Sequence, residues 1–199
     1  MTRSQLRLRP FSLFAVSLSI AAAAALVPAH ARAQDTTLDR VHNLIVTGRF
    51  TDAGSTLAQW EQSDGQPDSD ASANDRARAL FLRGLLTDDA LEAESSFLGV
   101  VLSYPSSPVA SEALLRLGQG LLTRGETRRS LAYLERLHSD YPGTDARMVG
   151  MLWLARAHRA AGSHTTACET AREGATATTD PNLRLLIEIE RDRACSASR

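Results

Sequence analysis

Residues of the same kind recur at a spacing of 37 positions through the second half of this chain. Several independent series share that one spacing, so the sequence predicts tandem repeats. Repeats of this length stack side by side, because each unit buries its apolar face against the next copy. The matching positions are Tyr104 and Tyr141, Pro105 and Pro142, Gly125 and Gly162, Leu115 and Leu152, and the small residues Ala93, Ser130 and Ala167.

The pattern predicts that each unit forms two helices joined by a tight turn. Apolar residues recur at helical spacing from Val109 to Arg124. Gly125 can end that helix because glycine adopts the left-handed conformation that a tight stop requires. A second helix is expected from Glu126 to Ser139, closed by Tyr141-Pro142, since proline cannot continue the hydrogen-bond ladder. The sequence therefore predicts an all-α fold of about three to four helical hairpins.

The clearest unit resembles the tetratricopeptide repeat. Its residues are Leu114-x2-Leu117-Gly118-x2-Leu121, then Ser130-x3-Leu134, then Pro142. The next unit has Ala155 in place of the glycine and His158 in place of an aromatic residue. The preceding unit matches in Ala93-x3-Phe97 and Pro105, while the register of its first helix, roughly residues 75–86, stays open. The resemblance implies a solenoid of helical hairpins whose first helices line a concave groove.

Five segments follow from these patterns. We expect residues 1–33 to be a cleaved signal peptide, 34–62 an N-terminal helical hairpin, 63–74 a flexible loop rich in Ser, Asp and Gly, 75–179 the tandem repeats, and 180–199 a capping helix with a short tail. Asp180 would serve as the N-cap of that last helix, directly before Pro181.

The first 33 residues have the composition of an export signal. Three arginines precede an uncharged apolar run from Phe11 to Val27, and Ala31-Arg32-Ala33 offers the small-x-small pattern that signal peptidase cleaves. A retained membrane anchor is the alternative, although the run is shorter than the about 20 residues of a membrane span. We expect a bacterial protein exported to the periplasm and soluble after cleavage.

The two cysteines, Cys168 and Cys195, both follow the leader. In an oxidising compartment an even count favours a disulfide, which would fix the capping helix to the last repeat. Closing such a loop would stabilise the fold by about 3 kcal/mol on the chain-entropy account. The alternative is a metal site that includes His164 and Glu169, but zinc requires three or four ligands at compact spacing. We expect no metal site.

Composition and motifs argue against two classes of function. All 22 basic residues are arginine, against 23 acidic residues, and neither half of the chain has the cationic excess that nucleic-acid binding requires. The sequence has no nucleophile elbow, phosphate loop or His-Glu-x-x-His motif. We therefore expect no nucleic-acid partner, no catalysis and no cofactor, and we interpret His158 as a packed core residue.

Binding of another protein is the remaining class. The tetratricopeptide pattern implies that residues one turn off the packing stripe face the groove, among them Glu112 and Val149. The alternative is that the leucines among them belong to the core, since a buried stripe can exceed about 100° in width. We interpret Arg124, Arg128 and Arg129 as a solvated edge. The expected groove has Leu115, Leu122 and Leu152 as an apolar floor, and Gln119, Arg156 and Arg159 as contacts to polar or acidic groups of a peptide.

The period of 37 and the Tyr-Pro ending are also similar to envelope repeat proteins, namely the C-terminal part of the Tol-Pal coordinator and the BamD-like outer-membrane assembly lipoproteins. No cysteine at the expected cleavage point could accept a lipid, and no heptad run matches the coordinator's coiled coil. The resemblance implies a non-catalytic protein–protein interaction module of the cell envelope that binds a partner segment in its groove. A self-associating structural scaffold of an envelope complex is the alternative.

Overall fold

A computed structural model describes residues 29–197 of the chain, with side chains from Thr37 onward. Most of the expected signal peptide therefore lies outside the described residues. Within them all of the regular secondary structure is helical, as the repeat pattern predicted. The helices are α1 (Ala29–Val46), α2 (Phe50–Ser63), α3 (Ala73–Leu86), α4 (Ala90–Ser103), α5 (Ala110–Thr123), α6 (Thr127–Asp140), α7 (Asp145–Ala160), α8 (His164–Ala177) and α9 (Pro181–Ala197).

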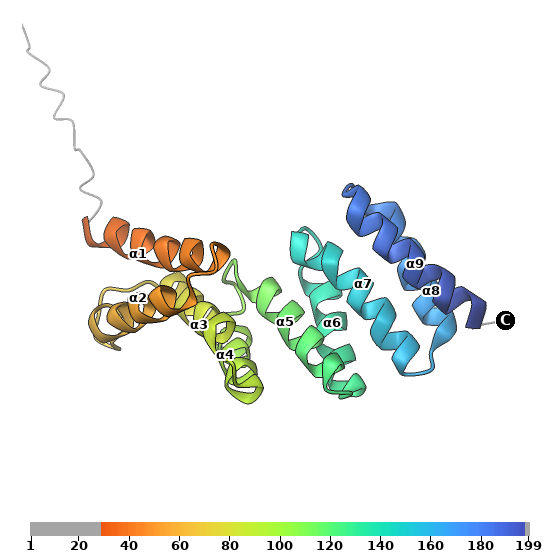
Figure 1. Cartoon of the computed structure of the whole chain (residues 1–199), viewed down its shortest axis with the longest axis horizontal. Helices are drawn as coiled ribbons and strands as arrows, with labels where there is room; N and C mark the ends of the chain where they lie inside the picture. Colours follow the sequence, from red (N-terminus) through yellow and green to blue (C-terminus); the bar gives the residue numbers. More distant parts are fainter. Residues whose placement is uncertain (1–28, 198–199) are drawn as a thin grey trace, which may run out of the picture.

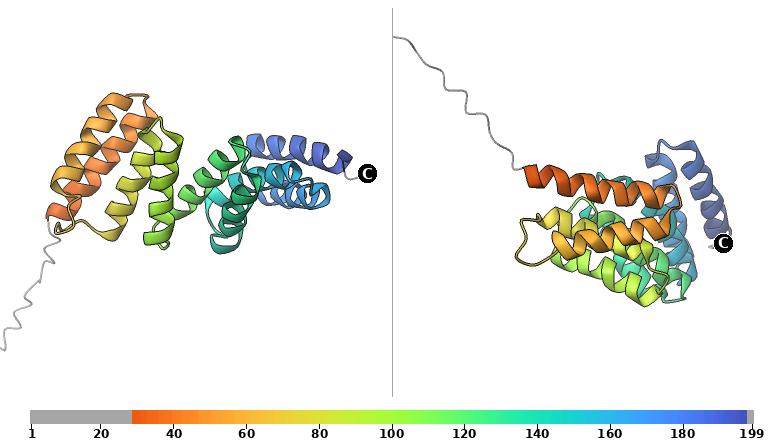
Figure 2. Two further views of the ribbon diagram at one scale, coloured as in Figure 1. Left: turned by 90° about the horizontal axis from the view of Figure 1, so that it is seen from below. Right: turned by 60° about the vertical axis from the view of Figure 1, so that its left-hand side comes forward.

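The helices form an elongated row of antiparallel hairpins, with α1 at one end and α9 at the other (Figures 1 and 2). Consecutive helices pack against each other along the whole row. First helices of neighbouring hairpins also lie side by side, as α1 does with α3, α5 with α7, and α7 with α9. Within the described part, α3 and α5 do not share such an extensive contact. The predicted solenoid is therefore confirmed, with one looser junction in its middle.

Three glycines end the first helix of a hairpin in the left-handed conformation. Gly48, Gly125 and Gly162 have φ angles of 75°, 79° and 78°. The residue after each glycine donates its N–H to the carbonyl five positions back, as Glu126 does to Leu121 at 2.9 Å. These bonds satisfy carbonyls that a helix end would otherwise leave unpaired. The predicted stops at Gly48 and Gly125 are therefore confirmed.

The two helices of a hairpin approach closely where a large side chain meets a small one. A Cβ on Gly84 would lie 2.7 Å from the Phe97 ring, and one on Gly118 would lie 2.5 Å from the Leu134 side chain. One unit later the residues at these two positions are both small, since Ala155 corresponds to Gly118 and Ala171 to Leu134. The two alanines pack in the same cluster. Gly84 therefore corresponds to Gly118, which settles the register of α3. It also shows that α3 ends only two residues beyond its contact glycine, whereas α5 continues to Thr123.

The packing of a large side chain on a glycine also shows that α9 continues the repeat. A Cβ on Gly150 at the start of α7 would lie 2.7 Å from Leu137 of α6. One unit later the glycine is on the other helix, and a Cβ on Gly174 of α8 would lie 3.3 Å from Ile187 of α9. The 37-residue register therefore extends into α9, which is the first helix of a unit whose second helix is missing from residues 29–197.

Two hydrogen bonds connect the helices within a unit and the ends of neighbouring units. The buried Ser130 hydroxyl donates to the Gly118 carbonyl at 2.7 Å, so the small residue at the crossing of α5 and α6 is also hydrogen-bonded. The Tyr141 hydroxyl donates to the Pro105 carbonyl at 2.7 Å. That bond joins the Tyr-Pro ends of two consecutive units.

The connection from α2 to α3 is tied down by hydrogen bonds. Arg76 Nη2 donates to the carbonyls of Gln66, Pro67 and Ser69 at 3.1–3.3 Å. The Ser72 hydroxyl accepts from the Asp75 N–H at 3.1 Å and begins α3. At the other end of the chain Asp180 accepts from the Asn182 N–H at 2.8 Å, as expected of the N-cap of α9.

Candidate functional site

Two leucines expected in the groove floor lie in the core instead. Leu115 is 5% exposed and Leu152 is 4% exposed, so the apolar floor predicted at these positions is wrong. The first helix α5 is covered by α7, and α7 is covered by α9. Leu152 packs in one cluster with Ile187 and the partly buried Leu183 of α9. Leu122 is half-buried against the central core, and Gln119 is half-buried beside it on α5.

The two arginines expected to contact a ligand are bound to an internal carboxylate. Arg159 Nε lies 2.5 Å from Glu190 Oε1, and Arg156 Nε lies 3.7 Å from Glu190 Oε2. Glu190 comes from α9, 31 residues after Arg159, and only 1% of its side chain is exposed. Arg156 also lies over the Trp153 ring, 4.8 Å from its centroid. Their predicted role as free acid-binding groups is therefore corrected.

A third arginine completes this cluster. Arg193 Nη1 lies 3.8 Å from Glu190 Oε2, which receives no hydrogen bond from any described residue. Three guanidinium groups thus surround one carboxylate, and two positive charges remain in excess. Arg156, Arg159 and Arg193 keep 30%, 37% and 62% of their side chains exposed. The surplus charge is therefore presented to solvent on the wall that α7 and α9 share.

An exposed apolar stripe runs beside this charge on α9. Leu186 is 46% exposed and Ile189 is 42% exposed, and with Arg193 they occupy positions i, i+3 and i+7 of one helix face. Sequence reasoning missed all three residues. The signal was present, because they continue the series of Val149, Leu152 and Arg156 by a further 37 positions. We call Leu186, Ile189, Arg193, Arg156 and Arg159 the α7–α9 wall.

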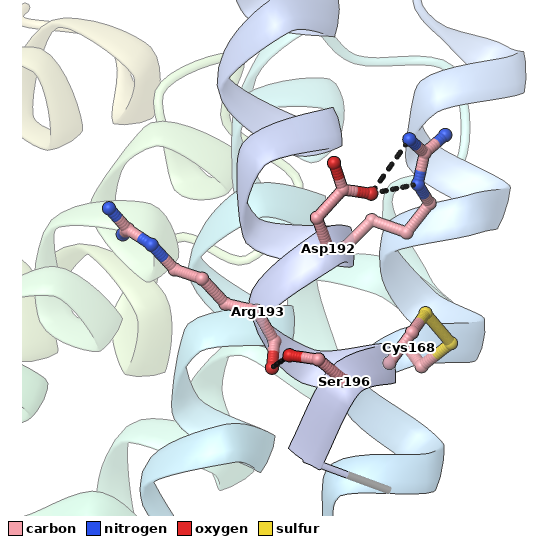
Figure 3. Close-up of a disulfide and its surroundings, with 6 residues drawn as sticks. Cys168, Asp192, Arg193 and Ser196 are labelled. Carbon is pink, nitrogen blue, oxygen red and sulfur yellow. Dashed lines mark hydrogen bonds and ion pairs between the residues drawn. A yellow bond between two sulfur atoms is a disulfide. The ribbon is translucent and has the colours of Figure 1, made fainter. Parts of the chain in front are cut away.

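A disulfide holds α9 in place. Cys168 of α8 and Cys195 of α9 are bonded, with their Cα atoms 4.9 Å apart (Figure 3). Figure 3 shows the Arg193 side chain extending from α9 away from the bridge. The bond therefore fixes one side of α9 against the last hairpin and leaves the other side available to the wall. No three His, Cys, Asp or Glu side chains gather as a metal site within the described residues.

The arginine-rich turn between α5 and α6 is more ordered than a solvated edge. Arg124 and Arg129 both pair with Glu94 of α4, which is 10% exposed in its side chain, and both also pair with Glu126. The hydrogen bonds that Arg129 and Arg124 donate lower the pKa of Glu126, and the bonds that Arg129 donates to Glu126 and Glu94 raise the pKa of Arg129 itself. All three arginines are exposed, as expected for this turn, and Arg128 alone among them forms no ion pair with another described residue.

His158 lies half-buried on α7, at the position where the repeat pattern has an aromatic residue. Burial lowers its pKa, and the charge of Glu135 raises it to a smaller extent. The neutral imidazole is therefore the form that suits this site.

Across residues 29–197, every helix is too short or too polar to serve as a membrane span.

Comparison with known proteins supports the repeat architecture. Residues 112–144 match the model of the tetratricopeptide repeat family. Two crystal structures of the TPR-like repeats of a putative kinesin light chain from Podosopora anserina are similar in fold. One of them, a single-substitution variant, has a TM-score of 0.61 and 18% identity, covering 85% of this chain and 88% of that chain. The other has a TM-score of 0.56 and 19% identity, covering 85% and 89%. No curated protein matches in sequence.

Proposed function

We propose that this chain is a non-catalytic adaptor of the bacterial cell envelope, and that it binds a segment of another protein on the α7–α9 wall. The observation that carries the proposal is the pairing of an exposed apolar stripe with surplus positive charge on one wall. Helical-hairpin solenoids commonly bind partners along an extended wall of this kind.

The chemistry of the wall defines the segment that would fit it. Leu186 and Ile189 would lose water on contact with apolar side chains, which supplies affinity. Arg193 is free to form a bidentate pair with a carboxylate, since its contact to Glu190 is long and its side chain is mostly exposed. The expected partner segment therefore alternates apolar and acidic residues, and the arginines add orientation and association rate.

The internal ion pairs make the wall rigid before a partner arrives. Glu190 is buried, and removing one partner of a buried charge costs about 3–5 kcal/mol. Arg156 and Arg159 are therefore held in place by the fold, and a partner does not have to order them. The disulfide adds to this rigidity by fixing α9.

The compartment is part of the proposal. The leader has the charge, apolar run and cleavage pattern of an exported protein, and a disulfide persists in an oxidising compartment. The similarity of period and Tyr-Pro ending to the Tol-Pal coordinator and to BamD-like proteins favours a role in one of those two envelope systems.

A pull-down from bacterial envelope extract tests the wall. The test variant carries Leu186→Asp and Arg193→Gln, which removes the wall charge without placing an acid beside Glu190. The matched control carries Leu102→Asp on α4, where the side chain is 72% exposed, and Arg172→Gln on α8. We expect the wall variant to recover at least tenfold less partner protein than the control variant does. Equal recovery from both variants, with both folded by circular dichroism, would exclude the wall as the binding site.

Arg156→Glu and Arg159→Glu are unsuitable for this purpose. Both changes would place an acid beside the buried Glu190 carboxylate and destabilise the packing of α9 on α7. A loss of binding in that variant would therefore not distinguish a lost contact from a disturbed fold.

Self-association is the second candidate function, because the same stripe is exposed on α9, the last helix of the described residues. A second copy could cover Leu185, which is 57% exposed, together with Leu186 and Ile189. Light scattering over a dilution series separates the two functions. A monomer at all concentrations supports the adaptor, whereas an oligomer that Leu186→Asp dissociates supports the scaffold.

A further inference from the structure

An apolar cavity of about 140 Å³ lies between α4 and α5. It opens at the edge of the stack where the α3–α4 and α5–α6 turns are, because the first residue of α4 and the C-cap of α5 both line it. This is also the junction where α3 ends early and lacks extensive contact with α5. The lining residues are Ala90, Ala93, Glu94, Phe97, Arg116, Leu117, Gly120, Leu121 and Arg124.

The repeat supplies two equivalent junctions in which this space is filled. Between α6 and α7, Leu131 stands at the position of Glu94 and Trp153 at the position of Arg116, and both pack against the core. Between α8 and α9 the positions of Glu94 and Leu121 are taken by the two bonded cysteines. Gly120 is replaced in the same two units by the buried Ala157 and Ala194.

The α4–α5 junction is therefore the one of these three that its own side chains leave open. An apolar cavity of about 150 Å³ in another protein takes up benzene, so the volume suits a single aromatic ring. It is well below the roughly 300 Å³ at which pockets for drug-sized ligands begin. A partner side chain is thus a better match in size than a free cofactor.

The rim adds a charge preference. Glu94 is already paired with Arg124 and Arg129, so its negative charge is compensated within the fold. Arg116 is exposed at the rim and forms no ion pair with the other described residues. The Arg116 guanidinium is therefore available to pair with a carboxylate of a ligand.

We propose that the α4–α5 cavity binds a phenylalanine-sized side chain of a partner protein, with a neighbouring carboxylate of that partner held by Arg116. The site shares with the proposed function only the premise of a protein partner. It lies on different helices from the α7–α9 wall, so either site can fail without the other.

The cavity can be tested with small probes on the full chain carrying labelled methyl groups. N-acetyl-L-phenylalanine supplies the ring and the carboxylate, its amide supplies the ring alone, and N-acetylglycine supplies the carboxylate alone. We expect saturable NMR shifts of the Leu117, Leu121 and Ala93 methyls with the first probe, weaker binding of the amide, and no saturable shift with N-acetylglycine.

Filling the cavity should abolish these shifts. A Cβ on Gly120 has its nearest neighbour, Arg124 Nη1, at 3.8 Å, so Gly120→Leu places its side chain in open space. Gly54→Leu on α2 is the matched control, since a Cβ there meets nothing within 4 Å. We expect loss of binding in the first variant and unchanged binding in the control. Gly120→Ala, which copies Ala157, provides a milder variant that should weaken binding if the leucine disturbs folding.

The rim is tested separately. Arg116→Gln should weaken N-acetyl-L-phenylalanine about tenfold, corresponding to about 1.4 kcal/mol, and leave its amide unchanged. Arg172→Gln on α8 is the control and should change neither. The proposal is overturned if the wild-type methyls show no saturable shift, or if the shifts persist in both Gly120 variants. It is likewise overturned if dilution, or removal of residues 1–28, shifts the same methyls, since the occupant would then be a second copy or this chain's own leader.

Discussion

Gly118→Ala tests whether the helices of a hairpin are matched by size. The added Cβ would lie 2.5 Å from both Cγ and Cδ2 of Leu134, closer than packed carbon atoms come. Cγ is the branch point of a side chain that is 1% exposed, so Leu134 cannot turn away without displacing its neighbours. Either the α5–α6 hairpin opens slightly or Leu134 leaves its preferred rotamer.

Two opposing contributions set the size of the effect. Overpacking a core by one methyl costs about 1–3 kcal/mol. Alanine is favoured over glycine inside a helix by about 1 kcal/mol. We therefore expect Gly118→Ala to lower the free energy of unfolding by up to about 2 kcal/mol. Gly54→Ala on α2 is the matched control, because a Cβ there meets nothing within 4 Å. It should raise the free energy of unfolding by up to about 1 kcal/mol.

The decisive comparison is a double-mutant cycle. Leu134→Ala alone leaves a cavity and should cost about 2–5 kcal/mol. Gly118→Ala combined with Leu134→Ala reproduces the Ala155 and Ala171 pair of the next unit, in which both positions are small. The clash is then absent and the new methyl occupies part of the cavity. The double variant should therefore be more stable than the sum of the single effects by about 1–3 kcal/mol.

Urea unfolding followed by far-ultraviolet circular dichroism measures all four proteins. Unchanged m-values would show that the variants unfold over a similar surface area. If the two substitutions add to within about 0.5 kcal/mol, the side chains are not coupled. The assignment of Gly84, Gly118 and Ala155 to one structural position would then lose its support.

Three further predictions concern single contacts. Replacing Cys168 and Cys195 by alanine should lower the free energy of unfolding by about 3 kcal/mol, measured by urea unfolding against the oxidised protein. Tyr141→Phe removes the hydrogen bond to the preceding unit and should cost about 0.5–1.5 kcal/mol in the same assay, with an unchanged fold. Because burial lowers the pKa of His158, the unfolded chain binds more protons below its ordinary value of 6.5, so stability should fall as pH decreases from 7 through that value. His158→Phe should flatten this dependence, and an equal slope in this variant and in the wild-type protein would contradict the role of burial.

The sequence determined the architecture because its signals are local or periodic. A glycine at φ near +75° and a proline after a helix act within a few residues, so Gly48, Gly125 and Pro142 could be interpreted without the fold. The spacing of 37 then required that the hairpins stack. The two cysteines offered one possible pairing, and the structure has that pair as a disulfide.

Which side chains remain available to a partner was decided only by tertiary structure. Helical spacing placed Leu115 and Leu152 on the stripe beside the packing face, but their burial depends on the next helix, which covers them. Arg156 and Arg159 were predicted as ligand contacts, yet a carboxylate from α9 binds them, and no local pattern links residues so far apart.

The same distinction applies to the open surfaces. Leu186 and Ile189 continue the stripe of the earlier units, but they are exposed because no further first helix covers α9 within the described residues. The α4–α5 cavity is lined by Glu94, Arg116 and Gly120 at positions where the next unit has the packed side chains of Leu131, Trp153 and Ala157. A repeat pattern specifies which residues face a neighbour, whereas burial depends on whether a neighbour is present and how large its side chains are.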